Sequence, residues 1–181
     1  MLVRYIKIAQ FLHSWRHQLC SGSFLLAIVF TVSSNFLISL PAEAATDTYV
    51  RVYLEVREPI ALELNEQGET KLFSTEDITE GKELFKANCI NCHVGGKTLP
   101  YPPVSLALDK LSGATPPRDN INGIVNFLRQ PMTYDGSEET FWCRTVTASW
   151  MPQEQIEKLA AFVLRAAQKA PGWAEDNPEQ F

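Results

Sequence analysis

Five consecutive residues, Cys89-Ile90-Asn91-Cys92-His93, constrain this 181-residue chain more than any other segment. In this C-x-x-C-H pattern two thiols are separated by one turn of chain and an imidazole follows directly, which is the signature of c-type haem attachment. The two thiols add across the vinyl groups of the porphyrin to give thioethers, and the imidazole then faces the iron. The pattern therefore predicts one covalently attached haem c, held by Cys89 and Cys92, with His93 as the proximal iron ligand.

Other chemistry built on two cysteines fits less well. A disulfide oxidoreductase would need a thioredoxin-like βαβ pattern around the motif, and none is apparent. A zinc knuckle would need a second pair of ligands, whereas Cys143 is the one cysteine downstream. A structural disulfide would leave His93 without a purpose.

The first 44 residues have the features of a targeting peptide. Arg4, Lys7 and Arg16 give a basic start, an apolar stretch follows, and residues 41–45 form an A-x-A site. We predict cleavage after Ala44, the alternative being a retained membrane anchor. The expected organisation is a cleaved signal peptide (1–44), an N-terminal β-hairpin region (45–73), a c-type haem domain (74–171) and a flexible tail (172–181).

Cleavage would change the counts that matter for chemistry. Of the four cysteines, three would remain: Cys89, Cys92 and Cys143. Of the three histidines, only His93 would remain. The mature chain would have 13 basic and 20 acidic side chains and a net charge of −7. An acidic chain of this kind is unsuited to nucleic acid, because the phosphate backbone selects basic surfaces.

The hydropathy pattern predicts a mainly α fold with a small hairpin. Residues 49–57 alternate as a strand would, and runs at 60–64 and 70–73 flank a turn at 65–68. A helix is expected to begin at Ser74, with Gly81 on its apolar face allowing another backbone to approach closely. Further helices are expected at 104–111, from 119 to the residue before Pro131, and at 153–169.

The second axial ligand of the iron is open between several residues. With His93 used, a second histidine ligand is excluded in the mature chain, which leaves Cys143, Met151 or Met132, or an open or water-bound site. We favour Cys143, because it would otherwise be a stranded thiol in an oxidising compartment. Met151 is the rival, because it precedes the last helix. A thioether would raise the reduction potential, whereas a thiolate would lower it.

Several other residues are candidates for contacts with the haem. Arg118 and Tyr134 are placed to meet a propionate, and Trp142 and Trp150 to shield the iron from water. Gly95-Gly96 and Pro116-Pro117 would shape the loops on either side.

Four segments resemble the cytochrome c-550 family, the low-potential cytochromes at the lumenal side of cyanobacterial and algal photosystem II. They are residues 80–85, 92–97, 114–121 (Ala-Thr-Pro-Pro-Arg-Asp-Asn-Ile) and 131–136 (Pro-Met-Thr-Tyr-Asp-Gly). The resemblance implies a class I cytochrome c fold, location in the thylakoid lumen and peripheral association with the membrane. It also implies photosystem II and a redox protein as partners.

The sequence departs from that family at two places and is most like a diverged branch of it. The family has a second axial histidine shortly after the Tyr-Asp-Gly turn, where this chain has Cys143, and its Gly- and Tyr-rich end is replaced here by an acidic one. We expect an electron carrier and not an enzyme. The alternatives are an extrinsic assembly or stabilising subunit of photosystem II with a mainly structural haem, and a haem sensor or small-gas enzyme with Cys143 as a labile ligand.

Overall fold

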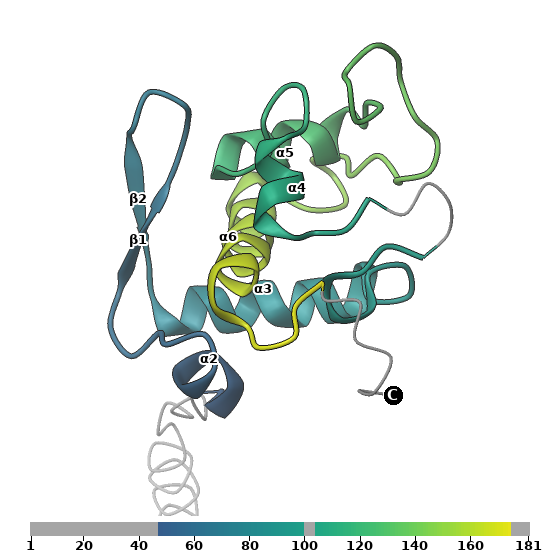
Figure 1. Ribbon diagram of the computed structural model, residues 1–181. Coiled ribbons are helices and arrows are strands. Elements are labelled where there is room, and N and C mark those ends of the chain that lie inside the picture. Colours follow the sequence, from purple (N-terminus) through teal and green to yellow (C-terminus); the bar gives the residue numbers. More distant parts are fainter. Residues whose placement is uncertain (1–46, 100–103, 175–181) are drawn as a thin grey trace, which may run out of the picture. The chain divides into compact units, whose positions relative to one another are not determined.

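The computed structural model describes residues 47–99 and 104–174 (Figure 1). The predicted signal peptide and the acidic end after residue 174 lie outside these described residues. The described elements are α2 (Thr48–Val52), β1 (Ile60–Glu63), β2 (Thr70–Phe73), α3 (Thr75–Asn88), the 3₁₀ turn η1 (Val94–Gly96), α4 (Leu108–Ser112), α5 (Ile121–Arg129) and α6 (Gln153–Lys169). The described part of the chain is mainly helical with one two-stranded sheet, as predicted.

The strand expected at residues 49–57 is wrong, because this segment begins with helix α2. The Asp47 carboxylate caps that helix by accepting the backbone N–H groups of Tyr49 at 2.8 Å and Val50 at 3.2 Å. Val50 and Leu54 are both fully buried and stand four residues apart, so they also fit one face of a helix. The alternation of apolar residues was therefore ambiguous, and the cap favours the helix.

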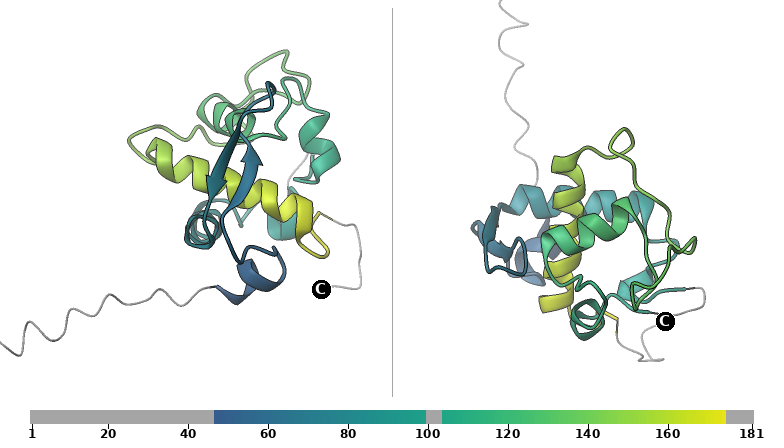
Figure 2. Two further views of the ribbon diagram at one scale, coloured as in Figure 1. Left: turned by 90° about the vertical axis from the view of Figure 1, so that its left-hand side faces the viewer. Right: turned by 90° about the horizontal axis from the view of Figure 1, so that it is seen from above.

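The predicted hairpin is confirmed. Strands β1 and β2 pair antiparallel, with Ile60 opposite Phe73 and Glu63 opposite Thr70. The turn between them is closed by the Asn65 side chain, which accepts the backbone N–H of Gln67 at 3.0 Å. Figure 2 shows this hairpin lying across α6.

Helix α3 begins where the sequence predicted, at a reciprocal cap. The Ser74 hydroxyl accepts the Asp77 backbone N–H at 3.2 Å, while the Asp77 carboxylate accepts the Ser74 backbone N–H at 2.9 Å. The buried face of this helix includes Ile78, Gly81 and Phe85. The cap sets the start of α3, and the apolar face turns its far end, which carries the C-x-x-C-H motif, toward the core.

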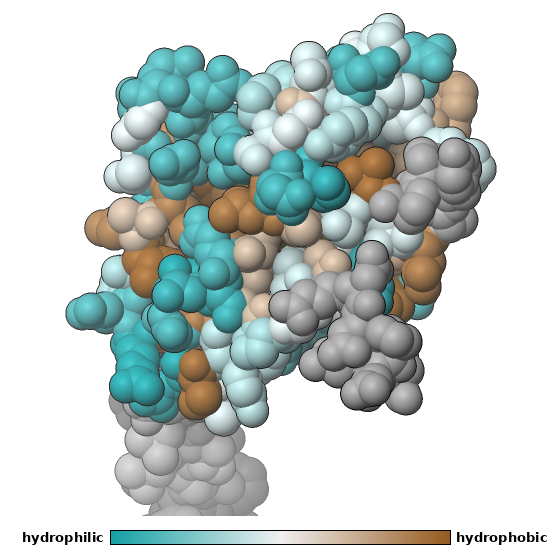
Figure 3. All heavy atoms as spheres, viewed as in Figure 1, coloured by the Kyte–Doolittle hydropathy of each residue, from teal (hydrophilic) through white to brown (hydrophobic). Residues whose placement is uncertain are grey.

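The later helices are also largely as predicted. Helix α6 has the expected bounds, and α5 begins after Asn120, whose side chain accepts the Gly123 backbone N–H at 2.8 Å. The short helix expected at 104–111 is α4, which begins at Leu108 because the preceding residues are extended. A groove between the hairpin and α4 is lined by Leu62, Leu108 and Leu164 together with polar residues that include Glu63 and Asp119 (Figure 3).

Helices α3 and α6 make the most extensive contact between elements, and Gly81 makes that contact possible. A Cβ atom at position 81 would lie 2.0 Å from the carbonyl oxygen of Lys158 on α6. The Lys158 ammonium then bonds Glu80 and Glu154 at 2.9 Å and Asp77 at 3.2 Å. The predicted close approach at Gly81 is confirmed, and the charges around Lys158 help to hold the crossing.

The first residues of the expected flexible tail are held in place. Trp173 is partly buried against the core, and the Ala174 backbone N–H donates to the Gly95 carbonyl at 2.7 Å. The first described residues of the predicted tail therefore make specific contacts, and the flexibility of the tail stays a prediction. Within the described ranges, no helix has the length and apolar character needed to cross a membrane.

The helix crossing makes a stability prediction. In an exposed helix, Gly→Ala stabilises by about 1 kcal/mol, but Gly81→Ala would force the backbones of α3 and α6 apart. We expect Gly81→Ala to lower the free energy of unfolding by about 1–3 kcal/mol, as overpacking does in well-packed cores. Denaturant unfolding of the mature holoprotein measures this change.

Lys86→Ala is the matched control, since Lys86 lies on the same helix with its side chain 67% exposed. We expect the control to change stability little. A Gly81→Ala variant that is as stable as this control would contradict the close crossing.

Candidate haem site

The C-x-x-C-H motif forms a tight turn at the end of α3. The Cys89 backbone N–H donates to the Phe85 carbonyl at 2.8 Å and so completes the helix. The backbone N–H groups of Cys92 and His93 both donate to the Cys89 carbonyl, each at 3.0 Å. The helix end and this turn therefore hold both thiols and the imidazole in one place.

The surroundings of His93 favour its neutral form. Its ring is partly buried 6.3 Å from that of Phe85, between centroids, and Nδ1 lies 3.1 Å from the Thr98 hydroxyl oxygen. Burial lowers the pKa of His93, with a backbone hydrogen bond at Lys97 acting in the opposite direction. Since metals bind neutral imidazole, this environment favours the form that can coordinate iron.

A third thiol, that of Cys143 in the loop before α6, lies within electrostatic range of the motif. Burial raises the pKa of Cys89 to about 12, and the nearby thiols of Cys143 and Cys92 act in the same direction. All three cysteines are free in the described structure. Burial also raises the pKa of Cys143, while the positive charge of Arg118 opposes that rise. The fold thus brings together a thiol distant in sequence and the two thiols of the motif.

Arg118 supplies a half-buried positive charge near this group. Its Nη2 donates to the carbonyl oxygens of Thr133 at 2.8 Å and Met132 at 3.2 Å, and the guanidinium lies 3.9 Å from the ring centroid of Phe127. Burial lowers the pKa of Arg118, whereas Cys143 and Tyr134 act to raise it. Its Nε is buried without a hydrogen-bond partner.

These features fit a haem group. A buried donor without a partner is costly, and an anion satisfies both its hydrogen bond and its charge. A haem propionate is such an anion, and the motif supplies the thiols and imidazole that a c-type haem needs. Cys89, Cys92 and His93 would hold the group, with Arg118 beside a propionate or the Cys143 thiolate.

The two methionines are placed differently from Cys143. The Met151 side chain is 2% exposed and belongs to the hydrophobic core. Met132 is partly buried and pairs with Glu139 in an isolated β-bridge. Protein side chains therefore already cover the Met151 thioether, whereas the Cys143 thiol lies next to the motif.

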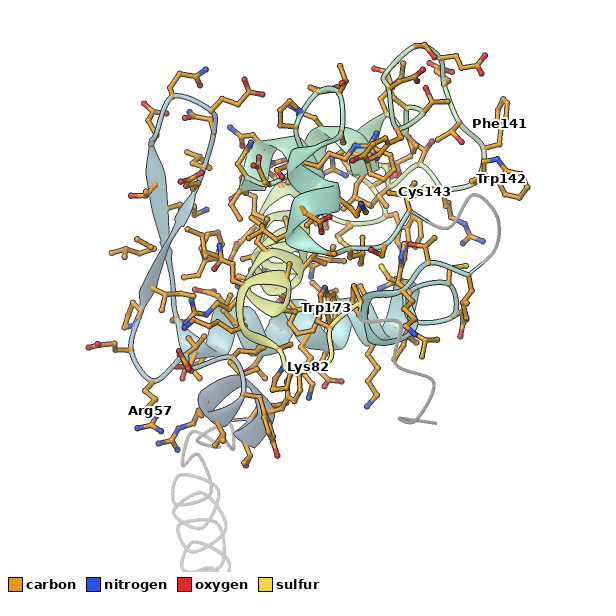
Figure 4. The ribbon with its side chains drawn as sticks, viewed as in Figure 1. Arg57, Lys82, Phe141, Trp142, Cys143 and Trp173 are labelled. Atoms are coloured by element: carbon orange, nitrogen blue, oxygen red, sulfur yellow. The ribbon has the colours of Figure 1, made fainter. Side chains whose placement is uncertain are left out.

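The aromatic residues near Cys143 do not lie as predicted. Phe141 is 96% and Trp142 68% exposed, and both point away from the body of the protein (Figure 4). Trp150 is 40% exposed and stacks with Arg144, whose guanidinium carbon is 5.5 Å from the ring centroid. The expectation that Trp142 shields the iron is wrong for this structure. Tyr134 is turned toward Gly113, where an added Cβ would lie 2.5 Å from its hydroxyl oxygen.

Two residues of the site were not identified from the sequence. Thr98 contacts His93, and Trp173 closes the segment after the motif by donating from Nε1 to the Leu106 carbonyl at 3.0 Å. The Trp173 ring lies against Gly96, where a Cβ would be 2.5 Å from it. A large aromatic residue in an otherwise polar tail was the one available signal for Trp173.

The position of Arg118 makes a prediction about the reduction potential. Removing a positive charge near the iron favours the ferric form, so Arg118→Gln should shift the potential to more negative values. The expected shift is on the order of 40 mV, which corresponds to about 1 kcal/mol for a one-electron couple. Potentiometric titration of the holoprotein measures it.

Arg57→Gln is the control, because Arg57 is exposed and lies at the opposite end of the molecule from Cys143 (Figure 4). It removes the same charge far from the site. Equal shifts in the two variants would show that Arg118 acts only through net charge.

Comparison with known proteins identifies relatives over most of the chain. Residues 52–180 match the model of the cytochrome c-550 domain. The chain is 53% identical over 154 residues to a cytochrome c-550-like protein of Trichodesmium erythraeum (strain IMS101), covering 85% of this chain and 93% of that one. It is 55% identical over 132 residues to photosystem II extrinsic protein V of Gloeobacter violaceus (strain ATCC 29082 / PCC 7421), covering 73% and 71%.

A crystal structure with the same fold is also known. It is that of the PsbV2 cytochrome from the cyanobacterium Thermosynechococcus elongatus, which matches with a TM-score of 0.70 and 56% sequence identity. The match covers 72% of this chain and 99% of the crystallised one.

Proposed function

The chain belongs to the cytochrome c-550 family, and we propose that it is a low-potential electron carrier whose single haem iron is bound by His93 and Cys143. Family membership confirms the resemblance drawn from the sequence motifs, the class I cytochrome c fold and the haem c cofactor. The ligand set and the redox role are the proposal. The signal peptide and its cleavage after Ala44 stay predictions.

The observation that carries the proposal is the placement of Cys143 beside the C-x-x-C-H turn. The thiols of Cys143, Cys89 and Cys92 are near enough to influence one another's pKa electrostatically, which supports a shared site. The rival Met151 is buried in the core by protein atoms. His93 is the one histidine of the predicted mature chain, so it cannot be joined by a second from the same molecule.

The chemistry of these two ligands favours a low potential. Haem c supplies an iron that takes up and releases one electron. A thiolate donates negative charge and stabilises the ferric state, whereas a thioether stabilises the ferrous state. Two strong ligands from the protein also allow the valence to change without exchange of a ligand, which suits an electron carrier better than an enzyme or gas sensor.

We further propose that the protein works in the thylakoid lumen at the lumenal surface of photosystem II. The support is its identity of 55% to a photosystem II extrinsic protein V and the predicted export of an acidic mature chain. A negative surface suits docking to a basic patch on a partner. The alternative role, as an assembly or stabilising subunit with a structural haem, shares this location.

The ligand assignment is tested by substituting Cys143. Cys143→Met should raise the potential by more than 100 mV, roughly 2–3 kcal/mol for a one-electron couple, because a neutral thioether replaces a thiolate. Cys143→Ala should remove the low-spin thiolate signal. Potentiometry and electron paramagnetic resonance of the oxidised holoprotein measure these changes.

Met151→Leu is the matched control, since it removes the rival sulfur but keeps an apolar core side chain. We expect its spectrum to stay that of the wild type. An unchanged spectrum in Cys143→Ala, together with an altered one in Met151→Leu, would reverse the assignment.

The partner proposal is tested with thylakoid membranes. The mature holoprotein should recover photosystem II subunits at low salt and lose them at high salt, because exposed charges are screened beyond about 10 Å at 0.1 M ionic strength. Pull-down with identification of the bound subunits measures this. Failure to recover any photosystem II subunit at low salt would refute docking while leaving the haem ligands untouched.

A further inference from the structure

The loop that follows the C-x-x-C-H turn places the side chain of Thr98 beside His93. The Thr98 hydroxyl oxygen lies 3.1 Å from His93 Nδ1, and the same hydroxyl donates to the backbone carbonyl of Val104. Thr98 is therefore the central member of a hydrogen-bonded chain of three residues, His93, Thr98 and Val104. Both ends of this chain are partly buried.

The number of available protons determines which group donates in each of these two hydrogen bonds. The Val104 carbonyl oxygen can only accept, so the single proton of the Thr98 hydroxyl is used there. The Thr98 oxygen can then only accept from the imidazole, and Nδ1 of His93 must carry a proton. The imidazole also makes a hydrogen bond with the backbone of Lys97, so Thr98 is one of two residues that hold the ring. In a neutral imidazole with its proton on Nδ1, the lone pair is on Nε2.

The backbone holds Thr98 in position. The Lys97 N–H donates to the Val94 carbonyl at 3.0 Å, and the Leu99 N–H donates to the Cys92 carbonyl at 2.7 Å. Thr98 thus lies between two residues tied back to the turn that carries His93. The Leu106 N–H donates to the Gly96 carbonyl at 2.7 Å, which secures the strand of chain that includes Val104.

We propose that Thr98 is a positioning residue that holds His93 with its proton on Nδ1 and its Nε2 directed to the iron. This inference rests on the proposed function, in which His93 is an axial ligand. A hydrogen bond that draws on the Nδ1 proton makes the imidazole a stronger donor through Nε2, which stabilises ferric iron. Thr98 therefore contributes to the low potential from the proximal side.

The test compares Thr98→Val, which keeps the shape but loses the hydroxyl, with Thr98→Ser, which keeps the hydroxyl. In the reduced, diamagnetic holoprotein, proton NMR with ¹⁵N-labelled histidine reports hydrogen exchange at His93 Nδ1. Loss of one hydrogen bond should make this exchange about fivefold faster in Thr98→Val. Thr98→Ser should retain the exchange rate of the wild type. The potential of Thr98→Val should also shift to more positive values.

Thr79→Val is a matched control on α3. The Thr79 hydroxyl donates to the Thr75 carbonyl at 2.7 Å, so this variant loses the same kind of hydrogen bond where no described contact reaches His93. We expect the control to leave the exchange rate and the potential unchanged. If Thr98→Val does not yield holoprotein, Thr98→Ala is compared with Thr98→Ser in the same way.

The outcomes separate this inference from the proposed function. Wild-type exchange and potential in Thr98→Val, with the optical spectrum of the native ligand set, would overturn the role of Thr98 and leave His93 as ligand. If the proposed function is wrong, the wild-type protein will instead give a spectrum without histidine ligation. Equal changes in Thr98→Val and Thr98→Ser would also overturn the proposal, because they would reflect packing and not the hydroxyl.

Discussion

The crossing of α3 and α6 at Gly81 determines where the haem site lies. Because the Lys158 carbonyl occupies the position of a missing Cβ, the two helices approach more closely than side chains would allow. One turn further along α6, the ring of Phe162 meets that of Phe85 on α3, with 5.4 Å between centroids. Phe85 in turn lies against His93. The helix crossing is thus linked to His93, the proposed iron ligand, through the rings of Phe162 and Phe85.

The same crossing explains how the end of the chain reaches the site. After α6 ends, Trp173 returns to pack on Phe85 and Phe162, with 5.8 Å and 6.0 Å between ring centroids. It then bonds the Leu106 carbonyl and closes over Gly96. The proximal side is therefore built from α3, the loop after it and the residues that follow α6, all anchored to one helix pair.

Local signals in the sequence predicted much of the fold. The start of α3 is determined by Ser74 and Asp77, and the bounds of α6 by its apolar period, so neither needs distant contacts. The prediction for the segment around Val50 was wrong because its apolar residues fit the period of a strand and that of a helix. Asp47 decides between them, and a capping residue before a five-residue helix is a weak signal.

The site was predictable only where the chemistry forces residues to be adjacent. Haem attachment requires Cys89, Cys92 and His93 to be near neighbours in the sequence, so the motif can be recognised there. The candidacy of Cys143 came from elimination, which needs no geometry. Thr98 and Trp173 could not be found in this way, because their partners are determined by how loops return to the turn. The prediction for Trp142 was wrong for the opposite reason. It is adjacent to Cys143 in the sequence, but its side chain points to solvent.

The charges of the proposed site form a consistent set. A Cys143 thiolate and the Thr98 hydrogen bond both increase electron density at the iron, and both favour the ferric state. Arg118 is the half-buried cation that opposes them, and its Nη2 already donates to the carbonyl oxygens of Met132 and Thr133. Its Nε is buried without a hydrogen-bond partner, so an anion on that side of the guanidinium would satisfy both the donor and the charge. Two groups therefore increase the electron density at the iron, and one cation, which already donates hydrogen bonds to two carbonyl oxygens, opposes them. This balance should favour the oxidised form and suit the site to electron transfer at low potential.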